Sequence, residues 1–330
     1  YGLEKEKEQK EADKLAEYKS TLTNDELEEL VKKTKELKEY QDTPSSQEDL
    51  EKIPMLELSD IKREPAKDYN DVKSVDGIKI VHHNIFTNKI AYINMSFDTK
   101  CVPDELIPYM GLLGSTLSLM DTKNYTYPEL TNEININCGG LATGTALYSD
   151  KVDFSKNTIV YEVKSKALYE KVPFVLGMME EIMYNTRFDD YKRLKEIIAR
   201  IKSRLEASLM GQGHSIAMLE CCAQFSESAY YSDILRGYKY YEFIKKLDEE
   251  FEQNKTQIVD KLNKLVGYIF NKDNVIVSLT ADDEGYDCFV KALSAKSCNI
   301  KDEHYNTAVR SFIPVNVKTG YTSASQVQYV

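Results

Sequence analysis

The segments of this chain that alternate apolar and polar residues come in neighbouring pairs, rather than singly between helices. Val72–His82 alternates around a turn at Asp76-Gly77 and is predicted to be a two-stranded hairpin, and Ile90–Phe97 is predicted to be a further strand. Leu141–Tyr148 and Thr158–Val163 form another pair. Strands in this order pair antiparallel with their neighbours. The pattern therefore predicts an α+β fold with a mixed, largely antiparallel sheet and helices packed on one face.

Helical periodicity dominates the remainder of the chain after residue 100. Helices are predicted over Pro103–Met120, Tyr127–Asn137, Leu168–Tyr184, Asp189–Met210, His214–Ser228, Tyr238–Glu250, Thr256–Phe270 and Glu284–Ser294. A short apolar strand, Val275–Thr280, is predicted between the last two. The first of these helices has an apolar stripe that is predicted to be buried, made of Ile107, Leu112, Leu113, Thr116, Leu117 and Met120.

Residues 1–52 differ from the rest because Glu and Lys dominate and glycine and proline are almost absent. Apolar residues at helical spacing predict two helices joined near Ser20–Thr23. The first carries Leu15, Tyr18 and Leu22, and the second carries Leu27, Leu30, Val31, Thr34 and Leu37. Thr23 followed by Glu26 is a capping box at the start of the second helix. We interpret the region as a helical hairpin that serves as a linker; the alternative, a partner-binding coiled coil, normally has a longer stripe.

Two prolines mark the connection to the sheet-forming region. Pro54 and Pro65 hold the residues before them out of helix, which predicts an extended connector. At the other end, Gln326–Val330 alternates like a strand whose partner is absent. Together with a first residue, Tyr1, that is not Met, this indicates a piece of a longer protein. The predicted limits are 1–52 for the hairpin, 53–71 for the connector, 72–315 for the α+β domain and 316–330 for the start of a truncated domain.

Composition excludes several classes of function. The net charge of −11 repels phosphate backbones, so nucleic acid is not an expected partner. No run approaches the ~18 apolar residues of a membrane helix, so no membrane partner is expected either. The six cysteines have irregular spacing and no C-x-x-C, which favours reduced thiols over disulfides or a zinc knuckle. They are Cys101, Cys138, Cys221, Cys222, Cys288 and Cys298.

The histidines do not form a metal motif. His82 and His83 lie on a predicted strand and point to opposite faces, so they are interpreted as packing or surface residues. His214 has no second histidine at helical spacing. His304 follows Asp302 in a polar loop, where a metal site is the alternative to a solvated loop, the preferred interpretation.

Other catalytic and phosphate-binding signatures are also missing. Neither H-E-x-x-H, H-x-x-E-H nor G-x-S-x-G occurs, and no glycine-rich phosphate loop follows a strand. Gly139-Gly140 precedes a predicted strand and Gly211-Gln212-Gly213 joins two helices. Tyrosine is common, with 23 residues, which suits either ordinary half-buried packing or the lining of a peptide channel.

Three stretches give the chain a resemblance to a known family. They are Gln47–Ile61, Thr126–Thr145 with its Tyr-Pro-Glu-Leu and Gly139-Gly140, and Gly213–Ala217 followed by Gly237–Phe243. In combination they resemble the insulinase/pitrilysin superfamily of zinc metallopeptidases, in the branch of presequence protease and falcilysin. The resemblance covers nearly all 330 residues. It implies two similar halves joined by a helical hairpin and closing around a peptide.

The resemblance also implies where a zinc motif would lie. The family places H-x-x-E-H on the helix after the second strand, and the matching residues here read Tyr109-Met110-Gly111-Leu112-Leu113. Tyr109 and Leu113 stand at the histidine positions and Leu112 at the glutamate position, and leucine does not bind zinc. The resemblance is therefore to the hairpin and first domain of the non-catalytic, C-terminal half. No catalytic, cofactor-binding or metal-binding residue is expected in this chain.

The resemblance implies an indirect function. In the parent protein, a zinc metalloendopeptidase, zinc would activate the water that attacks the peptide bond, and this portion would supply part of the chamber and the hinge. The implied partners are unfolded peptides and the N-terminal catalytic half. A bacterial cytoplasmic location is favoured, or an organellar matrix if the source is eukaryotic. The alternatives are a non-enzymatic scaffold with the peptidase fold and an α+β interaction module with a helical arm.

Overall fold

A computed structural model describes residues 2–64, 70–153, 156–295, 298–318 and 320. The chain divides into two compact units, Tyr1–Lys67 and Asp68–Val330, which are described separately. The predicted terminal strand Gln326–Val330 lies outside the described residues.

The first unit is helical. It contains α1 (Gly2–Thr21), α2 (Asn24–Asp42) and α3 (Gln47–Glu51), followed by a 3-10 turn at Leu58–Asp60. The predicted capping box is confirmed, because the Glu26 amide donates to the Thr23 hydroxyl and the Thr23 amide donates to the Glu26 carboxylate. Two helices joined just before Thr23 are therefore present, as the sequence predicts.

The apolar stripe of α2 does not lie in a core. Leu30, Val31 and Leu37 are 46 to 56% exposed, and no described residue of α2 is buried. A nearby stretch is more exposed still, with Met55, Leu56 and Leu58 all above 80%. Periodicity predicts that a helix has an apolar side but does not supply the surface that covers it.

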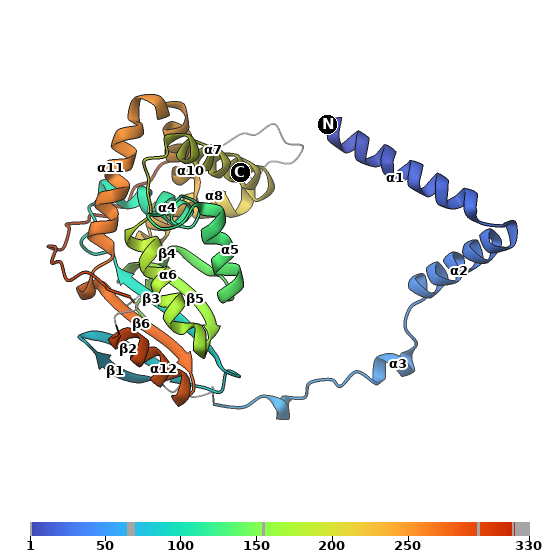
Figure 1. Cartoon of the computed structure of the whole chain (residues 1–330), viewed down its shortest axis with the longest axis horizontal. Coiled ribbons are helices and arrows are strands. Elements are labelled where there is room, and N and C mark those ends of the chain that lie inside the picture. Colours follow the sequence, from blue (N-terminus) through green and yellow to red (C-terminus); the bar gives the residue numbers. More distant parts are fainter. Residues whose placement is uncertain (1, 65–69, 154–155, 296–297, 319, 321–330) are drawn as a thin grey trace. The chain divides into compact units, whose positions relative to one another are not determined.

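The second unit is built on a six-stranded sheet, shown in Figure 1. Its strands are β1 (Asp71–Val75), β2 (Ile78–Asn84), β3 (Ile90–Asp98), β4 (Leu141–Ser149), β5 (Asn157–Leu168) and β6 (Val275–Ala281). The spatial order is β1-β2-β6-β3-β5-β4. Among these described strands only β2 and β6 pair in parallel, which confirms the predicted mixed, largely antiparallel sheet.

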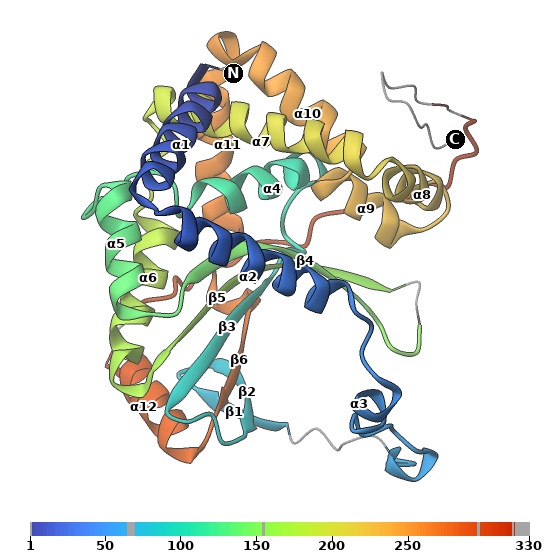
Figure 2. The ribbon, with the colours of Figure 1, turned by 90° about the vertical axis from the view of Figure 1, so that its right-hand side faces the viewer.

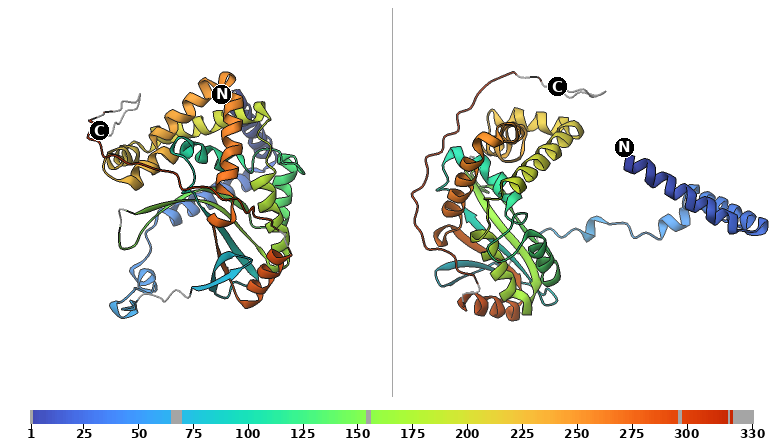
Figure 3. Two further views of the ribbon diagram at one scale, coloured as in Figure 1. Left: turned by 90° about the vertical axis from the view of Figure 1, so that its left-hand side faces the viewer. Right: turned by 45° about the horizontal axis from the view of Figure 1, so that its top comes forward.

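Helices cover one face of the sheet and also gather at one end of it. The helices are α4 (Ile107–Thr116), α5 (Tyr127–Asn137), α6 (Val172–Tyr184), α7 (Tyr191–Gly211), α8 (Gly213–Ala223), α9 (Glu227–Arg236), α10 (Tyr238–Glu249), α11 (Phe251–Ile269) and α12 (Asp283–Ser294). Short 3-10 turns occur at Asp104–Leu106, Tyr169–Lys171 and Lys272–Asn274. Figures 2 and 3 show α5, α6 and α12 along the sheet and α7 to α11 at its end.

The core lies between the sheet and these helices. Strand side chains that face inward, such as Ile80, Met95 and Leu279, are fully buried, and their strand neighbours face the other side. Phe97, Tyr161 and Phe270 meet edge to face, at centroid distances of 5.1 and 5.5 Å. The α+β class predicted from paired strands is confirmed.

Several of the predicted element limits are wrong, including the start of α11, which is Phe251 rather than Thr256. Strand β5 continues to Leu168, where a helix was predicted to begin, because the alternation of Glu162–Leu168 belongs to the sheet. The predicted helix His214–Ser228 is two helices, with a new N-cap at Ser226. The helix predicted to reach Met120 ends at Thr116, although its apolar stripe is buried as expected.

Two further observations bear on the sequence expectations. All six cysteines are free, and burial raises the pKa of the Cys298 thiol to about 12. Across the described residues, no helix combines the length and the apolar character that crossing a bilayer requires.

Candidate functional site

Helix α4 carries the Tyr109–Leu113 segment for which the sequence resemblance implies the place of a zinc motif, and its side chains form part of the core. Leu112 and Leu113 are fully buried, and Tyr109 is 6% exposed. The Tyr109 ring meets Phe243 edge to face at 4.8 Å, and the Lys261 Nζ donates to the Tyr109 hydroxyl at 3.2 Å. These residues do not fit zinc, since none of the three offers a histidine nitrogen or a carboxylate oxygen.

Two histidines on β2 lie on opposite faces of the sheet, as predicted. His82 is fully buried, with its Nε2 3.0 Å from the Ala281 carbonyl oxygen and its ring 4.6 Å from that of Tyr286. His83 points to the other face, where its Nε2 lies 3.1 Å from the Ser278 hydroxyl. Each imidazole is held by its own contacts on its own face of the sheet, so the two rings cannot bind one metal ion together. His214 is exposed and belongs to a different element, the start of α8.

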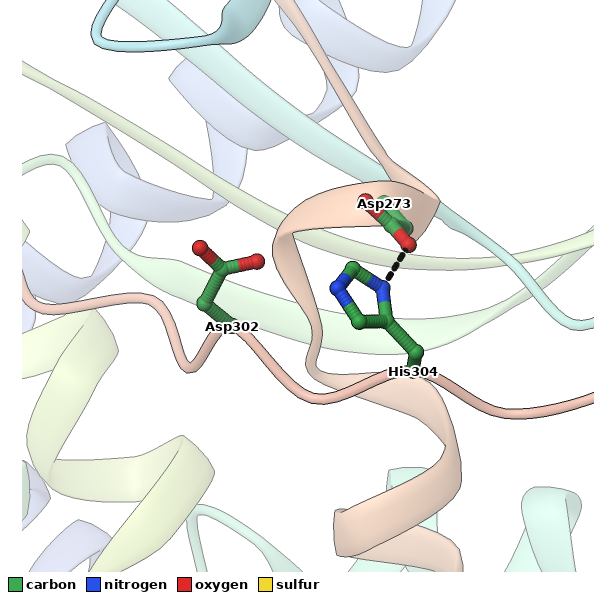
Figure 4. Close-up of side chains that lie close together, drawn as sticks. All are labelled: Asp273, Asp302 and His304. Atoms are coloured by element: carbon green, nitrogen blue, oxygen red, sulfur yellow. Dashed lines mark hydrogen bonds and ion pairs between the residues drawn. The ribbon is translucent and has the colours of Figure 1, made fainter.

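The structure brings His304 beside a carboxylate that is distant in sequence. Figure 4 shows its imidazole bonded to Asp273, with Asp302 on the other side of the ring. Each of the three residues offers an atom within 4.8 Å of the others, and all three are exposed. The hydrogen bond and the charge of Asp273 raise the pKa of His304, which favours the protonated ring. A protonated ring is a poor metal ligand, so we interpret the cluster as an exposed ion pair next to a second carboxylate.

The sheet face opposite the core carries polar side chains and an open cavity of about 440 Å³. Tyr92 and Asn94 of β3, Lys164 and Lys166 of β5 and Ser278 of β6 line it. They share one face because these residues are partners in the strand register. The cavity is open to solvent rather than enclosed.

A buried carboxylate organises part of this face. Glu162 is 6% exposed and accepts hydrogen bonds from the Asn94 amide and the Tyr148 hydroxyl, each at 2.9 Å. The Lys164 ammonium lies 2.6 Å from its other oxygen. Burial works against ionisation, but these donors outweigh it and lower the pKa of Glu162. At neutral pH the group is therefore an ionised carboxylate with hydrogen-bond or ion-pair partners on both oxygens.

The sequence interpretation did not identify this face. A signal was present, because β3 carries Asn94 and Ser96 and β5 carries Glu162, Lys164 and Lys166 at alternate positions. Polar alternation of this kind identifies one face of a strand but not which strands lie side by side. The strand order, with β6 inserted between β2 and β3, supplies that information.

Comparison with known proteins identifies the class of this chain. A family model described as peptidase M16 (subfamily C) associated matches residues 1–247, so the chain belongs to that family. The relationship to the presequence protease branch, predicted from the sequence, is confirmed.

Individual relatives agree with this assignment. Protein HypA of Clostridium perfringens is 36% identical over all of this chain, which corresponds to 34% of HypA. Presequence protease 1, chloroplastic/mitochondrial, of Arabidopsis thaliana is 29% identical over 81% of this chain and 25% of its own length. The chain thus spans about a third of HypA and a quarter of the plant protein. A solved structure of a conserved protein from Enterococcus faecalis V583 has the same fold over 72% of this chain and 54% of its own, with a TM-score of 0.51 and 11% identity.

Proposed function

We propose that this chain is the non-catalytic, C-terminal-half portion of a zinc-dependent metalloendopeptidase that degrades unfolded peptides. In this proposal the sheet unit forms part of the wall of the peptide chamber, and the helical unit of residues 1–52 is the linker that lets the two halves part. Zinc and the general base belong to the N-terminal half of the parent protein.

The observation that carries the proposal is the chemistry of α4. A helix that held zinc would present histidine and glutamate side chains to solvent, whereas Leu112 and Leu113 are fully buried in the core. Membership of a peptidase-associated family supports a role beside a peptidase site rather than in one. The open sheet face supports the role of a wall, because its polar rows are accessible to an extended peptide.

Photo-crosslinking tests the wall directly. A photoreactive phenylalanine analogue would replace Tyr92 on the open sheet face, and a matched variant would carry it at Ile136 of α5, which is also exposed. We expect an unfolded peptide to crosslink to position 92 and not to position 136. Equal crosslinking at both positions, or none at position 92, would contradict the proposal.

Location follows from the parent protein in the same proposal. We place it in the bacterial cytoplasm, or in an organellar matrix if the source is eukaryotic. Fractionation of cells that express the parent protein, followed by immunodetection, measures this.

A further inference from the structure

A second cavity, of about 520 Å³, lies within the sheet unit beside the edge strand β4. Small side chains on and just after α4 leave the space, namely Gly111, Gly114, Ser115 and Ser118. Gly114 lies so close to the strand that an added Cβ would be 3.2 Å from the Gly144 Cα. The remaining walls come from Thr143–Thr145 of β4 and from α7, α9 and α10.

Three arginines line this cavity, and among the described residues no acidic side chain does. Arg200 and Arg204 come from α7, and Arg236 ends α9. In the described parts of the chain none of the three has an ion pair or a hydrogen bond. Other cations of α7 differ, because Lys195 lies 2.8 Å from a Glu252 oxygen and Lys202 lies 2.8 Å from an Asp248 oxygen.

The three arginines are exposed to solvent and lie close together on one concave surface. Arg200 and Arg204 are four residues apart on one helix face, and like charges at this spacing destabilise a helix slightly. The chain as a whole has a net charge of −11, yet this concave surface gathers three positive groups. Cavities lined by one sign of charge attract ions of the opposite sign, and guanidinium groups pair closely with planar carboxylates.

A buried tyrosine forms part of one wall of the cavity. Tyr240 lines the cavity and is 4% exposed, and its hydroxyl has no hydrogen-bond partner among the described residues. Its ring is held against α4, since a Cβ at Gly111 would lie 2.8 Å from a ring carbon. Burial raises the pKa of Tyr240, so the hydroxyl keeps its proton and remains a donor. The hydroxyl oxygen itself is shielded from solvent, so Tyr240 shapes the cavity wall through its ring and the arginines supply the groups that a ligand can reach.

We propose that this cavity binds a carboxylate group of a peptide, held by Arg200, Arg204 and Arg236. This proposal rests on the proposed function, because it requires that peptides reach this surface. The edge strand favours a peptide over a free anion, because among the described strands β4 pairs only with β5 and its outer main-chain groups face away from the sheet. Acidic segments of unfolded peptides would therefore bind here in preference to neutral ones.

Binding of a labelled peptide to the whole 330-residue chain, followed by fluorescence anisotropy, tests the proposal. The probe is an unstructured peptide with two glutamates near its free C-terminus. The comparison peptide has the same sequence with glutamines in place of the glutamates and an amidated C-terminus. We expect the acidic peptide to bind at least about tenfold more tightly, as the loss of charge-assisted hydrogen bonds implies. In Arg204→Gln and Arg200→Gln this preference should disappear.

Arg187→Gln is the matched control, because it removes the same charge from an exposed residue that pairs with Asp189 outside the cavity. It should keep the preference. Equal binding of the two peptides would overturn the carboxylate site and leave the proposed function intact, whereas binding of neither would contradict both. Displacement of the acidic peptide by micromolar inorganic phosphate would overturn the assignment to a peptide.

Discussion

Helices α4 and α2 both carry an apolar stripe at helical spacing, but their surroundings differ. In α4 the stripe contacts the sheet unit's core, and Leu112 and Leu113 are fully buried. In α2 the stripe is about half exposed, and no described residue of that helix is buried. The comparison teaches that helical periodicity encodes an apolar side, while burial depends on what the rest of the chain places against it.

The difference also separates two roles. Helix α4 stabilises the unit that would form the chamber wall in the proposed function, and its leucines are buried in the core of that unit. Helix α2 is held mainly by its own capping box and by exposed ion pairs such as Glu29–Lys33. A helix of this kind suits the proposed linker, because local opening requires little loss of packing.

The largest expected difference appears when a leucine is truncated to alanine in each of the two helices. Leu113→Ala should lower the free energy of unfolding by about 2–5 kcal/mol, because it leaves a cavity in a packed core. Leu30→Ala, at a position 46% exposed, should change it by less than about 0.5 kcal/mol. Urea denaturation followed by circular dichroism measures both. Similar midpoint shifts in the two variants would remove the distinction between the helices.

A smaller effect is expected at the buried carboxylate of the open sheet face. Glu162→Gln should destabilise the sheet unit by about 1 kcal/mol at pH 7, because charge-assisted hydrogen bonds from Asn94, Tyr148 and Lys164 are weakened. The pKa of Glu162 is lowered in the folded state. The ionised carboxylate therefore stabilises the folded state fully above the ordinary carboxyl pKa of 4.5, and this contribution is lost as the pH falls through the lowered pKa.

The difference between wild type and Glu162→Gln should therefore shrink as the pH falls below about 4.5. Glu196→Gln, at an exposed position on α7, is the control and should show little pH-dependent difference. If the difference in free energy of unfolding between wild type and Glu162→Gln increases on acidification, the folded state favours the protonated acid instead.

The last comparison uses two capping boxes of the same sequence type, with an expected effect no larger than the effect at Glu162. Thr126 with Glu129 caps α5 of the sheet unit, as Thr23 with Glu26 caps α2. Thr126→Ala should cost about 1 kcal/mol of global stability, since α5 contributes buried Leu130 and Ile134 to the core. Thr23→Ala should leave the global midpoint unchanged and speed hydrogen exchange within α2 alone.

Exchange measured by mass spectrometry distinguishes these outcomes. In the wild-type chain, amides of α2 should exchange much faster than those of β3. Protection of α2 equal to that of β3 would show that the helical unit is a docked structural element, which is incompatible with a linker that opens.

Much of the fold could be predicted from local patterns. The β1–β2 hairpin, β3, α5 and the Thr23–Glu26 cap all follow from alternation, turn residues or capping chemistry close in sequence. The division between α8 and α9 was missed because no glycine or proline marks it. The end of β5 was missed because its exposed lysines resemble the start of a charged helix.

The candidate binding surfaces could not be predicted, because their residues are distant in sequence. The arginine-lined cavity joins Arg200 and Arg204 to Arg236 and to the small residues of α4, and only tertiary packing brings them together. The approach of Asp273 to His304 is of the same kind. By contrast, the prediction that Tyr109–Leu113 holds no zinc motif rests on five consecutive residues and needs no tertiary structure.

The zinc content of the purified chain tests the central claim most directly. After dialysis against zinc and then against metal-free buffer, plasma mass spectrometry should find far less than about one zinc per chain, and an unfolded peptide should remain uncleaved, because α4 presents no zinc ligands. Retention of about one zinc per chain together with peptide cleavage would contradict the account of this chain as a non-catalytic portion of the peptidase.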